Sequence, residues 1–197
     1  MRKISIFLFL FLLVSIFIFS LYLSIKDQKI YFELPSLTKP SPFPTPGVLG
    51  QRTKHEQCRI FGPLPDKDCT PGAIFPNVTK EQICTRGYSQ SVRDVSVNTK
   101  RKVYDEYGIS SHKPGEYEVD HLISLELGGS NDIANLWPEP AEPRPGFHEK
   151  DLVENYLHFQ LCSGKISLQE AQQKIANDWY NVYHSVTNIQ KFEFGNY

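Results

Sequence analysis

The stretch Tyr117-Glu-Val-Asp-His-Leu-Ile-Ser-Leu-Glu-Leu-Gly-Gly-Ser-Asn-Asp-Ile-Ala-Asn-Leu-Trp-Pro138 decides the fold that the sequence predicts. Its first residues alternate in polarity, which is typical of a strand that carries Asp120 and His121 as neighbours on opposite faces. Residues 128–131, Gly-Gly-Ser-Asn, are turn residues, so we expect the chain to fold back there. Residues 135–137 then indicate a short returning strand that ends at a proline-rich break.

A helical pattern follows the break. It begins at His148, keeps apolar residues at intervals of three and four as far as Leu161, and is expected to end at Gly164. A second helix is expected to begin after Ser167, with Trp179 in its buried stripe. The expected strands, loop and first helix bring four polar residues to one place: Asp120, His121, Asn135 and His148.

This combination of side chains has a chemical use. A carboxylate and a neutral imidazole can hold one divalent metal ion and leave positions open for other ligands. A second histidine with a pKa near neutrality can take a proton from water. Because the metal would stabilise charge on a phosphate and its leaving oxygen, the set suits phosphodiester hydrolysis.

The order and spacing of Asp120-His121, Asn135-Leu136 and His148 resemble the HNH endonucleases. Their ββα-metal (His-Me finger) motif runs Asp-His, a Gly-Gly loop, Asn-Leu and then a histidine on a helix. The resemblance covers residues 117–151 and extends to a bacterial group of membrane-anchored or secreted HNH-like proteins. It implies an α+β fold with a ββα-metal core and flanking helices.

The resemblance also implies a role for each residue. Asp120 and His148 would bind the metal, and His121 would be the general base. Asn135 would order the loop or join the metal shell. Mg²⁺ is the expected metal, with Mn²⁺ or Zn²⁺ as alternatives, and no small-molecule cofactor is expected. Two further side chains are expected to hold a phosphate: Arg144 and Lys150.

Residues 4–25 carry no charge, and serines are their main polar members. At about 1.5 Å per residue, a helix of this length spans a hydrocarbon core of roughly 30 Å. A cleaved signal peptide usually has a shorter apolar core and an Ala-x-Ala-like site, and this stretch contains no alanine. We therefore expect residues 1–25 to be a retained anchor with the bulk of the chain outside the cytoplasmic membrane. Secretion after signal cleavage is the alternative.

The rest of the chain divides into a spacer and one domain of ordinary size. Proline alternates with other residues over 34–50, so residues 26–50 are expected to be an extended linker. Residues 51–197 would form the HNH-like nuclease domain, with its core motif at 117–161.

The four cysteines have no metal-knuckle spacing. In a domain outside the membrane, an even number of cysteines favours two disulfides. Three pairings are possible, and we expect Cys84–Cys162 and Cys58–Cys69.

Charge differs between the two parts of this domain. Residues 51–115 carry 11 Lys or Arg against 7 Asp or Glu, whereas residues 116–197 carry 5 against 13. A basic part that binds substrate and an acidic part that binds metal would explain the difference, as would ordinary solvated surface. Residues 97–107 are expected to be helical, and Lys100-Arg101-Lys102 lie at the end that disfavours cations. That cost suggests that the three cations serve an interaction with something outside the domain.

The prediction is a membrane-anchored, metal-dependent endonuclease that acts on nucleic acid outside the cytoplasmic membrane, with DNA as the favoured substrate. A non-catalytic, metal-stabilised surface module that binds a partner is the alternative. It is favoured by the acidic charge of the site and by the prolines that lengthen the interval from Asn135 to His148. A structural zinc site at the same residues is a third interpretation.

Overall fold

The computed structural model describes residues 49–186 and 188. Contacts divide the chain into residues 1–43 and 44–197, and the described residues all belong to the second unit. The expected membrane span at 4–25 and the linker as far as residue 48 lie outside the described part. Within that part, none of the helices has the length and apolar character needed to cross a bilayer.

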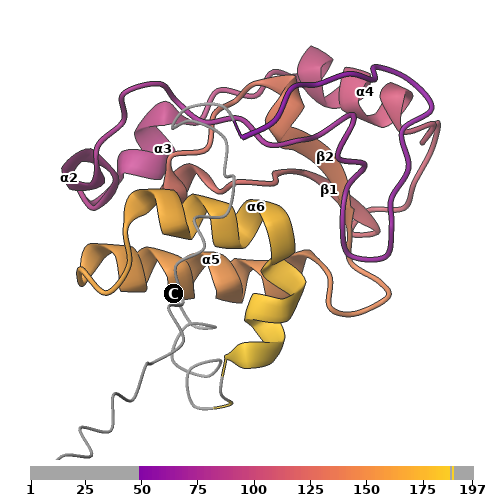
Figure 1. Ribbon diagram of the computed structural model, residues 1–197. Coiled ribbons are helices and arrows are strands. Elements are labelled where there is room, and N and C mark those ends of the chain that lie inside the picture. Colours follow the sequence, from indigo (N-terminus) through magenta and orange to yellow (C-terminus); the bar gives the residue numbers. More distant parts are fainter. Residues whose placement is uncertain (1–48, 187, 189–197) are drawn as a thin grey trace, which may run out of the picture. The chain divides into compact units, whose positions relative to one another are not determined.

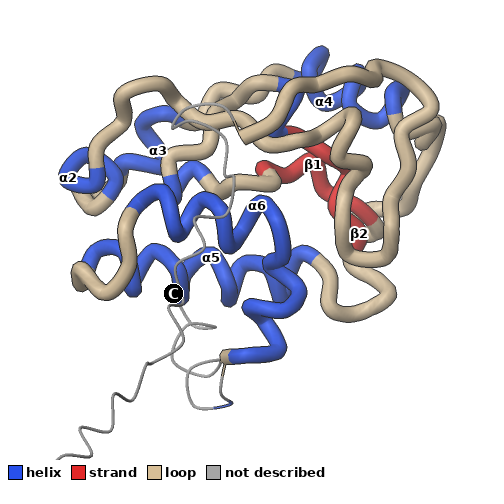
Figure 2. Tube along the Cα trace, in the orientation of Figure 1, coloured by secondary structure: helices blue, strands red, loops and turns tan. Residues whose placement is uncertain are grey.

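The fold is α+β, as predicted, with a small antiparallel sheet and helices on either side of it (Figure 1). Much of the described chain before β1 is loop, drawn in tan in Figure 2. The elements in chain order are α2 (Lys80–Ile83), α3 (Tyr88–Val92), α4 (Val97–Glu106), β1 (Tyr117–His121), η1 (Leu125–Leu127), η2 (Ile133–Asn135), β2 (Leu136–Pro140), α5 (Phe147–Cys162) and α6 (Leu168–Ser185).

Strands β1 and β2 pair antiparallel, from Tyr117 opposite Pro140 to His121 opposite Leu136. The prediction that a proline ended the returning strand is wrong, because Pro138 and Pro140 both lie inside β2. Proline has no N–H group to donate to a neighbouring strand. In a sheet of two strands each strand has one unpaired edge, and two prolines that are two residues apart can both direct their nitrogens to that edge.

The turn between the strands depends on its two glycines. Gly128 has a φ of +79°, a left-handed conformation that glycine adopts without steric cost. A Cβ atom on Gly129 would lie 1.7 Å from the carbonyl oxygen of Ile123, so a larger residue cannot fit there. The loop between the strands therefore turns back on itself, with residue 129 packed against the backbone of residue 123.

Helices α5 and α6 pack side by side on one side of the hairpin (Figure 1). The Ser167 hydroxyl accepts a hydrogen bond from the Glu170 amide at 3.1 Å, which caps α6 where the sequence predicted. Trp179 is fully buried, and its ring nitrogen donates to the carbonyl oxygen of Pro63 at 3.1 Å. The apolar faces of the two helices therefore close one core, and the loop before α2 covers part of it.

A second core lies between α4, β2 and the first loop, and includes Val103, Leu136 and Trp137. Helix α4 begins at Val97, the first residue of the expected helix, because the Ser96 hydroxyl accepts from the amide of Thr99 and caps it. Its three consecutive cations are exposed: Lys100, Arg101 and Lys102.

Both expected disulfides are formed. Cys58 and Cys69 are joined within the second core, where they are 5% and 0% exposed. Cys84 and Cys162 join the end of α2 to the end of α5 across 78 residues of sequence. The first disulfide thus closes a loop within the chain before α2, and the second ties α2 to α5.

Candidate active site

The four residues of the predicted motif come from the two strands and the start of α5. Asp120 and His121 are the last residues of β1, and Asn135 is the residue before β2. His148 is the second residue of α5 and is exposed. The charges of both His148 and Asp120 act on Glu118, so the start of α5 and the end of β1 share one acidic environment.

His121 is only 2% exposed and is held by an amide. Its Nε2 lies 3.1 Å from Oδ1 of Asn131, whose Nδ2 donates to the carbonyl oxygen of Val92 at 2.7 Å. A carbonyl oxygen can only accept, so it fixes the amide with Oδ1 towards the ring. His121 must then carry its proton on Nε2, which leaves the lone pair on Nδ1.

Nδ1 of His121 lies 4.0 Å from Oδ1 of Asp120. Burial lowers the pKa of His121, against the opposing effect of the Asp120 charge. The ring is therefore neutral at pH 7, and Nδ1 is the atom that can accept a proton.

Asn135 is fully buried, and its side chain is saturated by backbone groups. Oδ1 accepts from the amides of Ile123 at 2.9 Å and Ala73 at 3.4 Å, and Nδ2 donates to the carbonyl oxygens of Ile123 and Ser130, both at 2.9 Å. Of the two roles left open by the sequence, these contacts fit the ordering of the loop and leave no lone pair directed at a metal.

Lys150 is fully buried, so the expectation that it holds a phosphate is wrong. Its Nζ donates to Oδ2 of Asp120 at 2.7 Å, to the carbonyl oxygen of His121 at 2.8 Å and to Oε1 of Glu154. Glu139 lies 3.5 Å away. The ammonium group is an internal cation that fixes the end of β1 against α5 and leaves no donor for substrate.

The carboxylates around Lys150 outnumber it. Burial raises the pKa of Glu139 well above its usual value, and both oxygens of its fully buried carboxyl lack a hydrogen-bond partner among the described residues. Burial, with the charge of Asp120, raises the pKa of Glu154 to about 7 despite Lys150. Burial and neighbouring acids also raise the pKa of Asp151.

Asp120 shows the opposite shift. Burial acts to raise its pKa, but the charge and hydrogen bond of Lys150 outweigh burial and lower it. Asp120 is therefore ionised at pH 7. Lys150 occupies Oδ2, so Oδ1 is the oxygen left to a metal or a water molecule.

Arg144 is exposed on the loop before α5, and its guanidinium lies 3.4 Å from Glu142 and 3.5 Å from Glu149. Arg93, which the sequence did not single out, is a cation whose charge acts directly on His121. It is exposed and directly follows α3.

Sequence reasoning also missed Asn131, Glu139 and Glu154. Asn131 lies in the expected turn, 10 residues after His121, and its place in the sequence does not indicate that it contacts the ring. Glu154 could have been found, because it lies four residues after Lys150 on one helix face. Glu139 could not, since its burial depends on the register of β2.

Among the residues that the structure describes, the predicted ligands Asp120 and His148 belong to no compact group of three metal ligands. Across residues 49–186 and 188, one such group has ligand atoms within 4.8 Å of one another: Cys84, His158 and Cys162. Because Cys84 and Cys162 are joined in a disulfide, their sulfurs are not thiolate ligands in this state.

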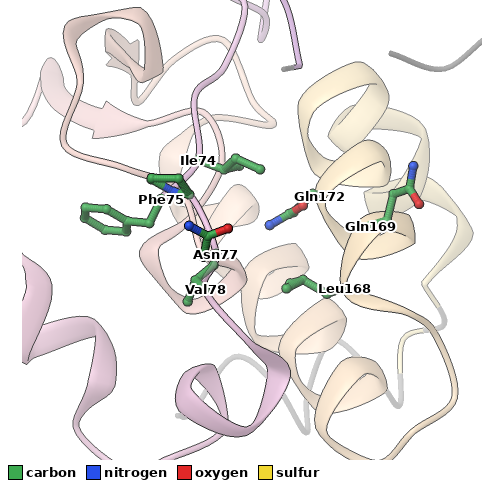
Figure 3. A pocket seen from close by; sticks show the side chains of 8 residues that line it. Ile74, Phe75, Asn77, Val78, Leu168, Gln169 and Gln172 are labelled. Atoms are coloured by element: carbon green, nitrogen blue, oxygen red, sulfur yellow. The ribbon is translucent and has the colours of Figure 1, made fainter. Parts of the chain in front are cut away.

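A shallow pocket of about 330 Å³ lies elsewhere, between the loop at 74–78 and the start of α6 (Figure 3). Its lining includes Ile74, Leu168 and the amides of Asn77 and Gln172, and it carries no charged side chain. None of the predicted site residues lines it, so it has no place in the proton chemistry of the motif.

Comparison of the chain with models of known protein families, with curated protein sequences and with solved structures found no match.

Proposed function

We propose that the chain is a metal-dependent endonuclease of the HNH type that hydrolyses phosphodiester bonds, with DNA as the favoured substrate. The arrangement of His121 carries this proposal. Asn131 leaves Nδ1 without a proton, burial keeps the ring neutral, and ionised Asp120 lies beside the ring to stabilise the imidazolium form. A general base needs these three properties.

In the proposed reaction, Nδ1 of His121 takes a proton from a water molecule whose oxygen attacks the phosphorus. The bond to the 3′ oxygen breaks, and that oxygen leaves and is protonated by solvent. Asn131 keeps the ring in its productive tautomer throughout. Lys150 holds Oδ2 of Asp120 and thereby fixes the direction of Oδ1.

The donor set, one carboxylate oxygen and one imidazole nitrogen, can hold a divalent cation such as Mg²⁺. Asp120 offers Oδ1 and His148 offers an exposed imidazole, in a region whose crowded carboxylates have raised pKa values. A bound cation would relieve that repulsion, and it would supply stabilisation of the charge on the phosphate and the leaving oxygen. Mn²⁺ and Zn²⁺ have chemistry compatible with the same two ligands.

We also propose that the domain works outside the cytoplasmic membrane, held by the apolar segment at 4–25 or released after its cleavage. Two disulfides in a domain of this size support an oxidising location. Labelling of intact cells with a membrane-impermeant reagent tests the location, and protection of the domain from that reagent would contradict it.

The test of function is cleavage of supercoiled plasmid and of single-stranded DNA and RNA by the full, oxidised chain in a mild detergent. Reactions contain Mg²⁺, Mn²⁺, Zn²⁺ or EDTA. The His121→Ala variant is expected to lose at least about a hundredfold in rate. His55→Ala, which removes an exposed histidine, is the matched control and is expected to keep the parent rate.

Nicking that needs metal and disappears only in His121→Ala would support the nuclease and its base together. Equal cleavage by His121→Ala and the parent would remove His121 as the base. Circular dichroism of both variants shows whether a lost rate reflects a lost fold.

One observation favours the alternative of a non-catalytic binding module. His121 is only 2% exposed, so substrate and water have little access to the ring unless the surrounding loop moves. A metal ion that raises the melting temperature of the full chain without cleavage of any substrate would support this module.

A further inference from the structure

The Cys84–Cys162 disulfide has a histidine beside it that the proposed nuclease reaction does not use. His158 lies four residues before Cys162 on α5, so the two side chains share one face of the helix. Its ring nitrogen and the two sulfurs lie within 4.8 Å of one another. Three atoms that can bind a metal are therefore gathered at the end of α5.

The state of His158 is unusual for a histidine. Its Nε2 is buried and has no hydrogen-bond partner among the described residues. A buried polar atom without a partner costs about 1–3 kcal/mol, so such atoms call for an explanation. A ligand that this nitrogen binds in another state of the protein would supply one.

We propose that reduction of the Cys84–Cys162 disulfide converts this group into a Zn²⁺ site. A dithiol donates two electrons and two protons; the S–S bond breaks, two thiols form, and the dithiol becomes a disulfide. Zn²⁺ then displaces the two thiol protons and binds both sulfurs and the ring nitrogen of His158 that lies beside them. Water or another small ligand completes the tetrahedral shell.

The conversion needs a local movement of the two sulfurs and no rearrangement of the elements that carry them. Zn–S distances are about 2.3 Å, so the two sulfurs, once reduced, need to separate to about 3.8 Å around the ion, which lies within the 4.8 Å already spanned by the three ligand atoms. All three residues are partly exposed, which gives a reductant and the ion access to them. In the described part of the chain, the Cys58–Cys69 disulfide has no third ligand of this kind and serves as an internal comparison.

The site would preserve a cross-link that reduction otherwise removes. Cys84 lies at the end of α2 and Cys162 at the end of α5, so Zn²⁺ would hold the same two elements together. Under reducing conditions, which remove the disulfide, metal binding would then contribute to folding stability in its place.

The experiment measures Zn²⁺ bound by the full chain in detergent, by competition with a chromophoric chelator. The oxidised chain gives the baseline, which includes any ion at the proposed nuclease motif. The chain reduced with a phosphine is expected to bind one Zn²⁺ more. With Co²⁺, the reduced chain should show thiolate-to-metal absorption and the visible bands of tetrahedral cobalt.

Three variants locate the additional ion. His158→Gln is expected to lower the affinity of the reduced chain for Zn²⁺ at least about tenfold, since it removes one ligand and leaves the disulfide possible. The double variant C58S/C69S should keep the additional ion, and His55→Ala is the control for loss of an exposed histidine. Parent-like affinity in His158→Gln would overturn the proposal.

If reduction itself unfolds the domain, circular dichroism detects this as a loss of helicity. If helicity falls on reduction, Zn²⁺ is expected to restore it in the parent and not in His158→Gln. A reduced chain that stays folded and binds no additional Zn²⁺ would overturn the proposal. So would an unfolded one that Zn²⁺ does not restore.

Discussion

Asn131 sets the protonation of the proposed base although it lies in a turn, 10 residues after His121. Its amide links the ring to the backbone of Val92, outside the hairpin. The tautomer of the base therefore depends on the placement of the last residue of α3. In the proposed reaction, a side chain that need not touch the substrate would therefore control the base.

Asn131→Ala removes the acceptor that holds the proton on Nε2 of His121. The tautomers then mix, and we expect the cleavage rate to fall by about tenfold to a hundredfold. ¹⁵N chemical shifts of the His121 ring measure the tautomer directly. Asn98→Ala, at an exposed position of α4, is the control. An unchanged rate and ring spectrum in Asn131→Ala would contradict this role.

At the scale of elements, α5 is attached to the hairpin by the buried ammonium of Lys150. Lys150→Met is expected to lower the free energy of unfolding by about 3–5 kcal/mol, because it leaves Asp120, Glu139 and Glu154 without their cation. Urea denaturation at pH 5 and pH 7 measures the loss. The loss should be greater at pH 7, where more of these carboxyls are charged.

Glu139→Gln is the matched comparison within the same cluster. The pKa of Glu139 lies well above its usual value, so its carboxyl is protonated at pH 5 and resembles an amide. We expect this variant to change the free energy of unfolding by less than about 1 kcal/mol at pH 5. A loss as large as that of Lys150→Met would mean that Glu139 is ionised there.

The elements were more predictable than the site because their signals are local. The capping sequence after Ser167 and the turn at Gly128 give the helix and the hairpin within a few residues. The partners of Lys150 come from β1, β2 and α5, and no local pattern gives their distances. A lysine in the first turn of a helix normally lies in solvent, so its sequence position predicted a phosphate ligand where the packing makes an internal cation.

At the scale of the whole molecule, the acidic cluster makes stability depend on pH. The folded-state pKa of Glu154 is about 7, against a usual value of 4.5, so the folded chain binds the additional proton between these values. Stability therefore falls as pH rises through this window. The lowered pKa of His121 acts in the opposite direction just below pH 6.5.

Glu154→Gln isolates the contribution of Glu154. The fall in the free energy of unfolding between pH 5 and pH 8 is expected to be smaller in this variant than in the parent, by on the order of 2–3 kcal/mol. Thermal and urea unfolding at several pH values without metal measures the difference. Glu170→Gln, at an exposed position of α6, controls for loss of one surface charge. Identical pH profiles for the parent and Glu154→Gln would exclude Glu154 as the source.

The two disulfides restrain the unfolded chain to different extents, since they join residues 11 and 78 apart. Chain entropy predicts losses of about 3 kcal/mol for C58A/C69A and about 4–5 kcal/mol for C84A/C162A. Denaturation of both double variants in oxidising buffer with a metal chelator measures the two losses. Cys69 is fully buried in the second core, whereas Cys84 and Cys162 are partly exposed. Lost packing alone would therefore destabilise C58A/C69A more than C84A/C162A, the reverse of the order that chain entropy predicts. A greater loss in C58A/C69A would show that the core around Cys69, and not the length of the closed loop, dominates the contribution of these cross-links.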